Sequence, residues 1–188
     1  MRYIETIKIE HGEIRHLNRH LDRIYASSGI EIDNLDVPEE WRRGVVKCRI
    51  IYSDTIESIT FMNYVYPVIR SLRMVNSSDV KYDKKYADRS GLDKLFEQRN
   101  GCDDILIVRD GMITDSYFCN VVFENGDGLF TPEECLLRGT KRSQLIESGV
   151  ITTRPISVAD IHQFTRVRLV NAMIDLEDDV TVDIESIF

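Results

Sequence analysis

The sequence predicts an α+β fold whose larger part is barrel-like, and three observations support this prediction. Segments in which polar and apolar residues alternate, as in strands with one buried face, recur along the 188-residue chain. Turn residues such as Asp110-Gly111 separate these segments in pairs, which indicates hairpins. Short stretches with apolar residues at three- and four-residue steps interrupt the hairpins, and this mixture favours an α+β architecture.

The first third of the chain contains the elements of a small α+β domain. Apolar residues from Leu17 to Tyr25 recur at helical spacing, and Gly29 suits the end of that helix. Pro67 follows the last strand segment, so we expect domains at residues 1–68 and 69–188. The predicted elements are strands at Tyr3–Glu10, Val45–Tyr52 and Ser58–Tyr66, a pairing segment at Glu13–Ile14, the helix from Leu17, and a short helix at Pro38–Trp41.

The remaining two thirds alternate strands with short helices. Asp88 or Ser90 is suited to cap a helix over Gly91–Arg99, and Gly101 to end it. Asp110-Gly111 joins the next two strands as a hairpin turn. The predicted elements are strands at Asp104–Val108, Met112–Phe123, Leu129–Thr131, Val150–Ile156, Val167–Ile174 and Val180–Ile184, a helix at Gly139–Glu147, and a helical turn at Ala159–Phe164.

Charge and composition exclude several classes of function. The formal net charge is −8, whereas a nucleic-acid-binding protein normally carries a basic face. No apolar run is long enough to cross a membrane, and the chain does not open on a signal peptide. The four cysteines are widely spaced and the four histidines follow no zinc-like pattern, so we expect reduced thiols, no metal site and a cytoplasmic location.

The stretch from Lys85 to Arg142 contains the residue types that a pyridoxal phosphate site requires. Schiff-base chemistry needs a lysine amine, and four lysines compete for that role: Lys81, Lys84, Lys85 and Lys94. Taken alone, each of them is more typical of a solvated surface residue. Asp115 interrupts an apolar strand and could partner the pyridine nitrogen, or it could complete the preceding hairpin. Gly139-Thr140 opens a helix suited to a phosphate, or forms an ordinary helix start.

A histidine and an arginine lie on one face of the first helix. Arg23 follows His20 by three residues, so the two side chains project from nearly the same side. The spacing alone is more typical of an arginine with a solvated head group beside a packed histidine.

Several motifs, in order, resemble the class IV aminotransferase family, the fold type IV pyridoxal phosphate enzymes. The opening IETIKIEHGEI and the helix HLDRIYAS resemble its F-E-T strand and H-x-x-R helix. The stretch KKYADRS resembles the K-x-x-N-R of the 4-amino-4-deoxychorismate lyases in this family. GMITDSYFCNVVF and LFTP…LLRGTKR resemble the two halves of the family signature, and VNAMI resembles the lyases' N-A-[LM].

The resemblance implies a role for each matching residue. Lys85 is then the Schiff-base lysine, because it alone among the competing lysines has an arginine, Arg89, four residues on. Asp115 takes the place of the glutamate at the pyridine nitrogen, and Asn120 that of the signature asparagine. The residues implied at the cofactor phosphate are Arg23, Thr140, Lys141, Asn171 and Ala172.

Three departures from the family pattern stand out. Asp115 is a methylene shorter than the usual glutamate, and Thr140-Lys141 replace an aliphatic residue and a threonine. The strand and glycine-rich turn that usually precede the position of Ile4 have no counterpart, so the small domain has a shortened start. The glycine-rich loop of the small domain, which helps to hold substrate, has no clear match either.

The resemblance implies a pyridoxal phosphate enzyme acting on a small molecule, as a homodimer. The lysine motif and VNAMI favour a lyase that eliminates pyruvate from aminodeoxychorismate to give p-aminobenzoate for folate biosynthesis. Arg49 and Arg89 are then candidates for binding the substrate carboxylates. The alternatives are an aminotransferase acting on a small D- or branched-chain amino acid, and a shortened family member without catalysis.

Overall fold

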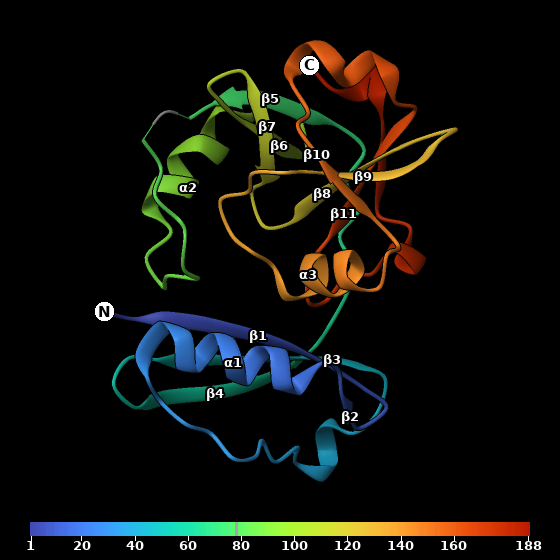
Figure 1. Ribbon diagram of the computed structural model, residues 1–188. Helices are drawn as coiled ribbons and strands as arrows, with labels where there is room; N and C mark the ends of the chain where they lie inside the picture. Colours follow the sequence, from blue (N-terminus) through green and yellow to red (C-terminus); the bar gives the residue numbers. More distant parts are fainter. Residues whose placement is uncertain (78) are drawn as a thin grey trace. The chain divides into compact units, whose positions relative to one another are not determined.

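The computed structural model describes residues 1–77 and 79–188 and confirms the α+β fold (Figure 1). The chain forms two compact units. The first comprises Met1–Val65 with Lys84–Asp88, and the second comprises Tyr66–Asp83 with Arg89–Phe188. The division into domains at residues 68 and 69 stays a prediction. Within the described residues, no helix has the length and apolarity needed to cross a bilayer.

The first unit is a four-stranded antiparallel sheet with a helix on one face (Figure 1). The strands follow the order β2-β1-β3-β4, so the two strands nearest the N-terminus pair with each other at one edge. The bounds are β1 Tyr3–Glu10, β2 Glu13–Ile14, α1 Leu17–Ser28, η1 Glu39–Trp41, β3 Val45–Tyr52 and β4 Ile56–Asn63. These elements agree with the prediction, except that the fourth strand begins and ends earlier than expected.

Alternation along β1 and the apolar stripe of α1 explain this packing. Ile7 on β1, Ile24 on α1 and Ile50 on β3 are fully buried in one apolar core. Gly29 ends the helix in the left-handed conformation, with φ of 77°, and its amide donates to the carbonyl of Tyr25 at 2.7 Å. A residue with a Cβ is disfavoured there, so the predicted helix end is confirmed.

The second unit is built on an eight-stranded mixed sheet (Figure 1). Six strands follow the order β10-β9-β8-β7-β6-β5, and β11 adds to β8 and carries β12. The strands are β5 Leu72–Asn76, β6 Asp104–Arg109, β7 Met112–Ser116, β8 Asn120–Asn125, β9 Gly128–Pro132, β10 Thr152–Arg154, β11 Arg166–Val170 and β12 Thr181–Asp183. The helices are α2 Ser90–Phe96, η2 Glu97–Arg99, α3 Thr140–Glu147, η3 Val158–Gln163, η4 Leu176–Asp178 and η5 Ile184–Ser186.

The core of this unit follows the apolar runs of its central strands. Ile105 and Ile107 on β6, Phe123 on β8 and Val167 on β11 have no exposed surface. Strand β8 pairs with β7, β9 and β11, so it is the strand on which the sheet branches. Residues at the start of β8 are therefore held from several sides.

The predicted strand Met112–Phe123 is wrong as a single element. It breaks into β7 and β8 around a tight turn, in which the Ser116 amide donates to the carbonyl of Cys119 at 2.8 Å. The hydroxyl of Ser116 also accepts from the Cys119 amide at 3.1 Å. The turn folds β8 back beside β7 and pairs Asp115 with Asn120, which a continuous strand could not do.

Three further expectations also need correction. The strand expected over Val167–Ile174 ends at Val170, where the chain turns. The strand expected over Val150–Ile156 shortens to β10, because the flanking segments leave the sheet. Helix α2 spans Ser90–Phe96, so Arg89 occupies the N-cap position that was expected for Asp88 or Ser90.

Candidate functional site

The carboxylate of Asp115 is buried and is held by two hydrogen-bond donors. Its Oδ1 accepts from the Asn120 side-chain amide at 2.6 Å, across the turn that joins β7 and β8. Its Oδ2 accepts from the backbone amide of Leu136. The Asn120 amide also donates to the carbonyl of Leu137 at 2.9 Å, which fixes its orientation. The structure therefore brings the predicted pair Asp115 and Asn120 together.

Burial raises the pKa of Asp115 to about 7. The hydrogen bonds from Leu136 and Asn120 and the positive charges of Arg142 and Arg109 act in the opposite direction and lower it. The carboxyl group is thus close to its titration midpoint at neutral pH. A cation placed beside it, such as a protonated pyridine ring, would favour its ionised form.

Gly139 precedes helix α3 at a point where no larger residue fits. A Cβ built on Gly139 would lie 2.1 Å from Oδ1 of Asn120, the side chain that orients Asp115. Gly139 is extended, with φ of −66° and ψ of 142°, and has no side chain that could accept from the first amides of the helix. The start of α3 therefore lies close to the Asn120 side chain that holds Asp115.

Arg142 anchors α3 and was missed as a site residue. Its buried guanidinium donates from Nε to the hydroxyl of Thr131 at 3.2 Å and from Nη2 to the carbonyl of Pro132 at 2.7 Å. These bonds join the helix to β9 and place a positive charge near Asp115. The signal in the sequence was the arginine that ends the motif LLRGTKR.

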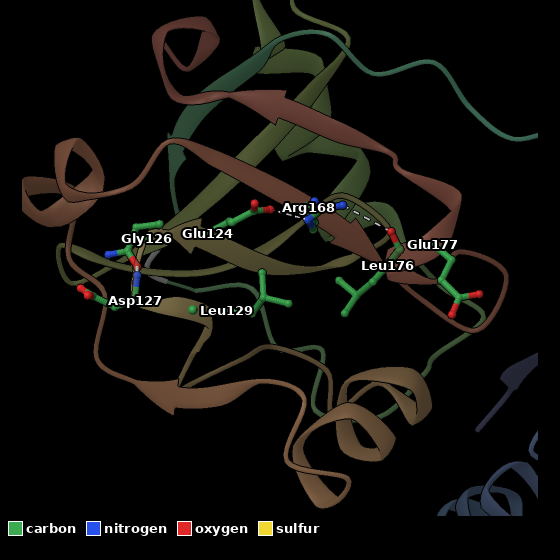
Figure 2. A pocket seen from close by; sticks show the side chains of 9 residues that line it. Glu124, Gly126, Asp127, Leu129, Arg168, Leu176 and Glu177 are labelled. Atoms are coloured by element: carbon green, nitrogen blue, oxygen red, sulfur yellow. Dashed lines mark hydrogen bonds and ion pairs between the residues drawn. The ribbon is translucent and has the colours of Figure 1, made fainter.

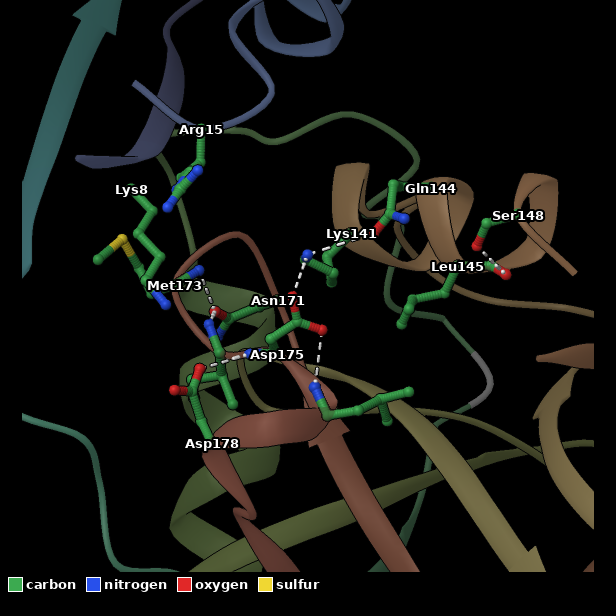
Figure 3. A network of polar contacts seen from close by, with 12 residues as sticks. Lys8, Arg15, Lys141, Gln144, Leu145, Ser148, Asn171, Met173, Asp175 and Asp178 are labelled. Atoms are coloured by element: carbon green, nitrogen blue, oxygen red, sulfur yellow. Dashed lines mark hydrogen bonds and ion pairs between the residues drawn. The ribbon is translucent and has the colours of Figure 1, made fainter. Parts of the chain in front are cut away.

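The side chain of Asn171 closes the turn that follows β11. Its Oδ1 accepts from the amides of Met173 at 2.7 Å and Ile174 at 3.0 Å (Figure 3). Its Nδ2 donates to Sγ of Cys119 at 3.1 Å, so this turn is tied to the one between β7 and β8. Ala172 lies within the same turn and is half-buried.

In the first unit, Arg23 and His20 both contact a buried carboxylate, Glu5. Arg23 donates to Glu5 through Nε at 3.0 Å and through Nη2, and Nδ1 of His20 lies 2.9 Å from Oε1 of Glu5. Burial by itself would raise the pKa of Glu5, but the charge of Arg23 and the hydrogen bonds from both residues lower it to about 2. Glu5 is the glutamate of the opening motif IETIKIE and was not among the predicted site residues.

The structure separates the four competing lysines. Lys81 and Lys94 are exposed, as expected of solvated side chains. The amine of Lys84 donates to the carbonyls of Ala26 at 3.5 Å and Ser27 at 3.3 Å, at the end of α1. Lys85 is half-buried, and its carbonyl accepts from the amide of Ile4 at 2.8 Å, so β1 fixes its backbone.

The two arginines suggested for the substrate lie in different environments. Arg89 donates to the Tyr82 hydroxyl at 3.2 Å and to the carbonyl of Tyr117 at 2.7 Å. Its guanidinium carbon lies 4.6 Å from the centre of the Tyr117 ring, a cation–π geometry. Arg49 lies on β3 opposite Thr6, and it is exposed.

A separate groove of about 480 Å³ lies at the hairpin of β8 and β9 (Figure 2). Arg168 lies between the Glu124 carboxylate at 2.6 Å and Asp179 at 3.0 Å, and also donates to the carbonyl of Leu176. None of the residues that line the groove is a predicted cofactor residue. The groove is therefore distinct from the site around Asp115.

Comparison with known proteins relates the chain to a family. A family model described as amino-transferase class IV matches residues 62–176. An uncharacterized protein of Haemophilus influenzae is 34% identical over 180 residues, which are 90% of this chain and 96% of that protein.

Solved structures share the fold. A proposed 4-amino-4-deoxychorismate lyase from Haemophilus somnus has a TM-score of 0.81 and 30% identity, covering 92% of this chain and 96% of its own. A hypothetical aminotransferase from Mycobacterium tuberculosis in a PLP-bound form has a TM-score of 0.74 at 18% identity, and the match covers 99% of this chain and 81% of the other. The match at 18% identity shows likeness of fold.

Proposed function

The chain belongs to the class IV aminotransferase family and is a pyridoxal phosphate-dependent enzyme, and from this premise we propose that it is a lyase of the 4-amino-4-deoxychorismate type. In this proposal it removes pyruvate from aminodeoxychorismate and releases p-aminobenzoate, a precursor for folate biosynthesis. We also propose that it acts in the cytoplasm as a homodimer.

One observation carries the assignment of the cofactor residues. Asp115 is a buried carboxyl whose two oxygens are oriented by Asn120 and Leu136, and nearby Gly139 opens helix α3 without a side-chain cap of its own. A carboxylate beside an anion-binding helix start matches the two charged ends of pyridoxal phosphate.

When bound, pyridoxal phosphate supplies an electron sink for negative charge at the carbon that bears the substrate amine. We assign to Asp115 the task of holding a proton on the ring nitrogen, through a hydrogen bond from that nitrogen to its carboxylate. Burial strengthens this contact, because opposite charges attract more strongly where water is excluded. The shorter aspartate suffices if the Asn120 and Leu136 donors aim its oxygens at the ring.

Lys85 is the residue that we propose as the nucleophile and proton carrier. Its half-buried position and fixed backbone suit a lysine whose amine is released and then moves a proton at the reacting carbon. Lys84 beside it is unsuited, because the carbonyls at the end of α1 occupy its amine.

The phosphate contacts are proposed on the same basis. The amides of Thr140 and Lys141 at the first turn of α3 are suited to the phosphate oxygens. We propose that Asn171 and Ala172 contribute from the turn after β11, and that Arg23 contributes a positive charge. Glu5 then holds the Arg23 guanidinium in place by accepting two of its hydrogen bonds.

Within the family, the proposal of a lyase has two supports. The motifs KKYADRS and VNAMI resemble those of the lyases. The Haemophilus somnus protein, itself a proposed 4-amino-4-deoxychorismate lyase, is 30% identical over nearly its full length. Arg49 and Arg89 remain our candidates for the substrate carboxylates.

The first experiment locates the reactive lysine. Purified protein is mixed with pyridoxal phosphate, reduced with borohydride, digested, and analysed by mass spectrometry. We expect the reduced adduct on Lys85 in the wild type and its loss in Lys85→Met, together with the visible absorption band. Lys84→Met is the matched control and should keep both. An adduct on another lysine, or none in the wild type, would reject this assignment.

A second experiment separates the two reactions. Aminodeoxychorismate is supplied, and p-aminobenzoate is followed by its fluorescence while pyruvate is measured with lactate dehydrogenase. Equal amounts of the two products would support the lyase. If D- or L-amino acids with 2-oxoglutarate react and aminodeoxychorismate does not, the enzyme is an aminotransferase instead.

A further inference from the structure

Lys141 stands where the family pattern has a threonine, and its side chain has a defined structural partner. The side chain is 7% exposed, and its Nζ forms an ion pair with the carboxylate of Asp175 (Figure 3). Nζ also donates to Oε1 of Gln144 at 3.2 Å, one turn further along α3. The ammonium group is thus directed at Asp175.

Asp175 is itself held in place by bonds to the following helix. Its Oδ1 accepts from the amide of Leu176 at 2.8 Å, and its own amide donates to Oδ2 of Asp178 at 2.7 Å. The backbone amide of Asp178 donates in return to the Asp175 side chain, and these two bonds between Asp175 and Asp178 form a capping box at the start of η4. Asp175 is therefore a fixed anchor for Lys141.

The ion pair joins two segments that are distant in sequence. Lys141 lies in the first turn of α3, and Asp175 directly follows the turn closed by Asn171. Thirty-four positions separate the two residues. A partly buried ion pair carries a desolvation cost that offsets much of the attraction between its charges, so its net contribution to stability is small. A role in fixing local geometry therefore explains this pair better than a gain in stability does.

We propose that Lys141 and Asp175 act together as a brace that sets the spacing between the start of α3 and the Asn171 turn, the two segments assigned to the cofactor phosphate. The inference rests on the proposed function. Lys141 is here a positioning residue, which orients the phosphate-binding amides while its ammonium group stays on Asp175.

A different role for Lys141 predicts an opposite result. If the ammonium group left Asp175 and bound the phosphate itself, Asp175 would compete with the cofactor. Removing the charge of Asp175 would then strengthen cofactor binding. In the brace, removing that charge loosens the two segments and weakens binding.

The test compares two ligands that differ in the phosphate alone. Dissociation constants of pyridoxal phosphate and pyridoxal are measured by absorbance titration for wild type, Lys141→Met and Asp175→Asn. Each variant should bind pyridoxal phosphate about tenfold more weakly, because the charged hydrogen bond between Lys141 and Asp175 no longer holds the two phosphate-binding segments at their spacing. Pyridoxal should change by less than about twofold, since it lacks the phosphate. The double variant should be no weaker than either single variant, because one interaction is removed in each case.

Asp179→Asn is the matched control. Asp179 pairs with Arg168 at 3.0 Å at the other end of η4, its side chain is 68% exposed, and its φ of 51° suits asparagine. We expect both dissociation constants to stay within about twofold of wild type. Lys141→Arg should retain most of the affinity, because it keeps the charge that Asp175 binds.

The outcomes decide between the explanations. Tighter or unchanged binding of pyridoxal phosphate in Asp175→Asn overturns the brace, and so does an equal loss for both ligands, which would indicate general damage to the fold. Apoprotein melting with inorganic phosphate adds a readout that needs no lysine chemistry: phosphate should raise the wild-type Tm more than that of either variant. If the wild type responds to phosphate but forms no adduct on Lys85, the proposed function fails and the brace stands. If it binds neither phosphate nor pyridoxal phosphate, both fail.

Discussion

The effect of Asp115 on the stability of the folded protein depends on pH, and replacing it with asparagine should remove this dependence. The carboxyl is fully buried, with a pKa of about 7 against an ordinary value of 3.8. This difference corresponds to about 4 kcal/mol, at about 1.4 kcal/mol for each pH unit. At pH values between these two pKa values, the carboxyl keeps its proton in the folded state but has lost it in the unfolded chain. The carboxyl therefore destabilises the folded apoprotein increasingly from pH 4 to pH 7.

The asparagine variant lacks this titration but loses a hydrogen bond. Its amide NH₂ would face either the Asn120 or the Leu136 donor, at a cost of about 1–3 kcal/mol. That cost does not depend on pH in this range. We therefore expect the free energy of unfolding of Asp115→Asn, relative to wild type, to rise by about 4 kcal/mol between pH 4 and pH 8.

The assay is urea unfolding of the two apoproteins at pH 4, 6 and 8, followed by circular dichroism. Cofactor binding should respond in the opposite direction, because asparagine cannot pair as an anion with a protonated ring nitrogen. The variant would then be more stable as apoprotein at pH 8 and yet bind pyridoxal phosphate more weakly. If the difference between the unfolding free energies of variant and wild type changes by less than about 1 kcal/mol from pH 4 to pH 8, the reasoning about Asp115 is refuted.

Two further substitutions test the supporting structure. Gly139→Ala places a Cβ 2.1 Å from Oδ1 of Asn120, so we expect a loss of about 1–3 kcal/mol in unfolding free energy and weaker cofactor binding, measured by urea unfolding and titration. Glu5→Gln leaves the charge of Arg23 without its buried partner, at a cost of about 3–5 kcal/mol near pH 7. The pKa of Glu5 is lowered to about 2 in the folded protein. The ionised Glu5 side chain therefore contributes fully to the free energy of unfolding above its ordinary pKa of 4.5, and this contribution disappears as the pH falls toward 2.

Each substitution has a matched control within its own unit. Gly126→Ala adds a Cβ in open space, and it should change stability by less than about 0.5 kcal/mol. Glu10→Gln removes a carboxylate that pairs with the exposed Arg15 at 2.8 Å, and it should cost at most about 1 kcal/mol. Equal losses in control and test variants would show that the Asn120 contact and the buried Glu5 have no special role.

Several elements could be predicted because short-range signals specify them. The alternation of β1 and the helical spacing of α1, with Gly29 after it, give the right elements in the right places. The hairpin turn at Asp110-Gly111 is also present, with Asp110 in the left-handed conformation at φ of 50°. These features depend on a few neighbouring residues and on which face is apolar.

The breaks in the predicted strands could not be read in the same way. Tyr117–Cys119 and the turn after Val170 lie within apolar runs that read as continuous strands. Ser116 and Asn171 stabilise these turns through hydrogen bonds, and polar residues of this kind are common in strands as well. The first missed turn lies between the strands that carry Asp115 and Asn120, and the second contains Asn171 and Ala172, so the departures from the local rule lie beside the candidate site.

The sequence by itself determined the class of the protein, the family resemblance, and the identity of Asp115, Lys85 and Arg23 as residues of interest, because residue types and their order are encoded locally. The tertiary structure alone decided which donors hold Asp115, why Gly139 cannot carry a Cβ, and that Lys141 pairs with Asp175. The physical reason is that burial and the partners of a polar group depend on segments far apart in the chain. Those segments meet only when the sheet has formed, so the shift of a pKa and the partner of an ion pair are decided only at that point.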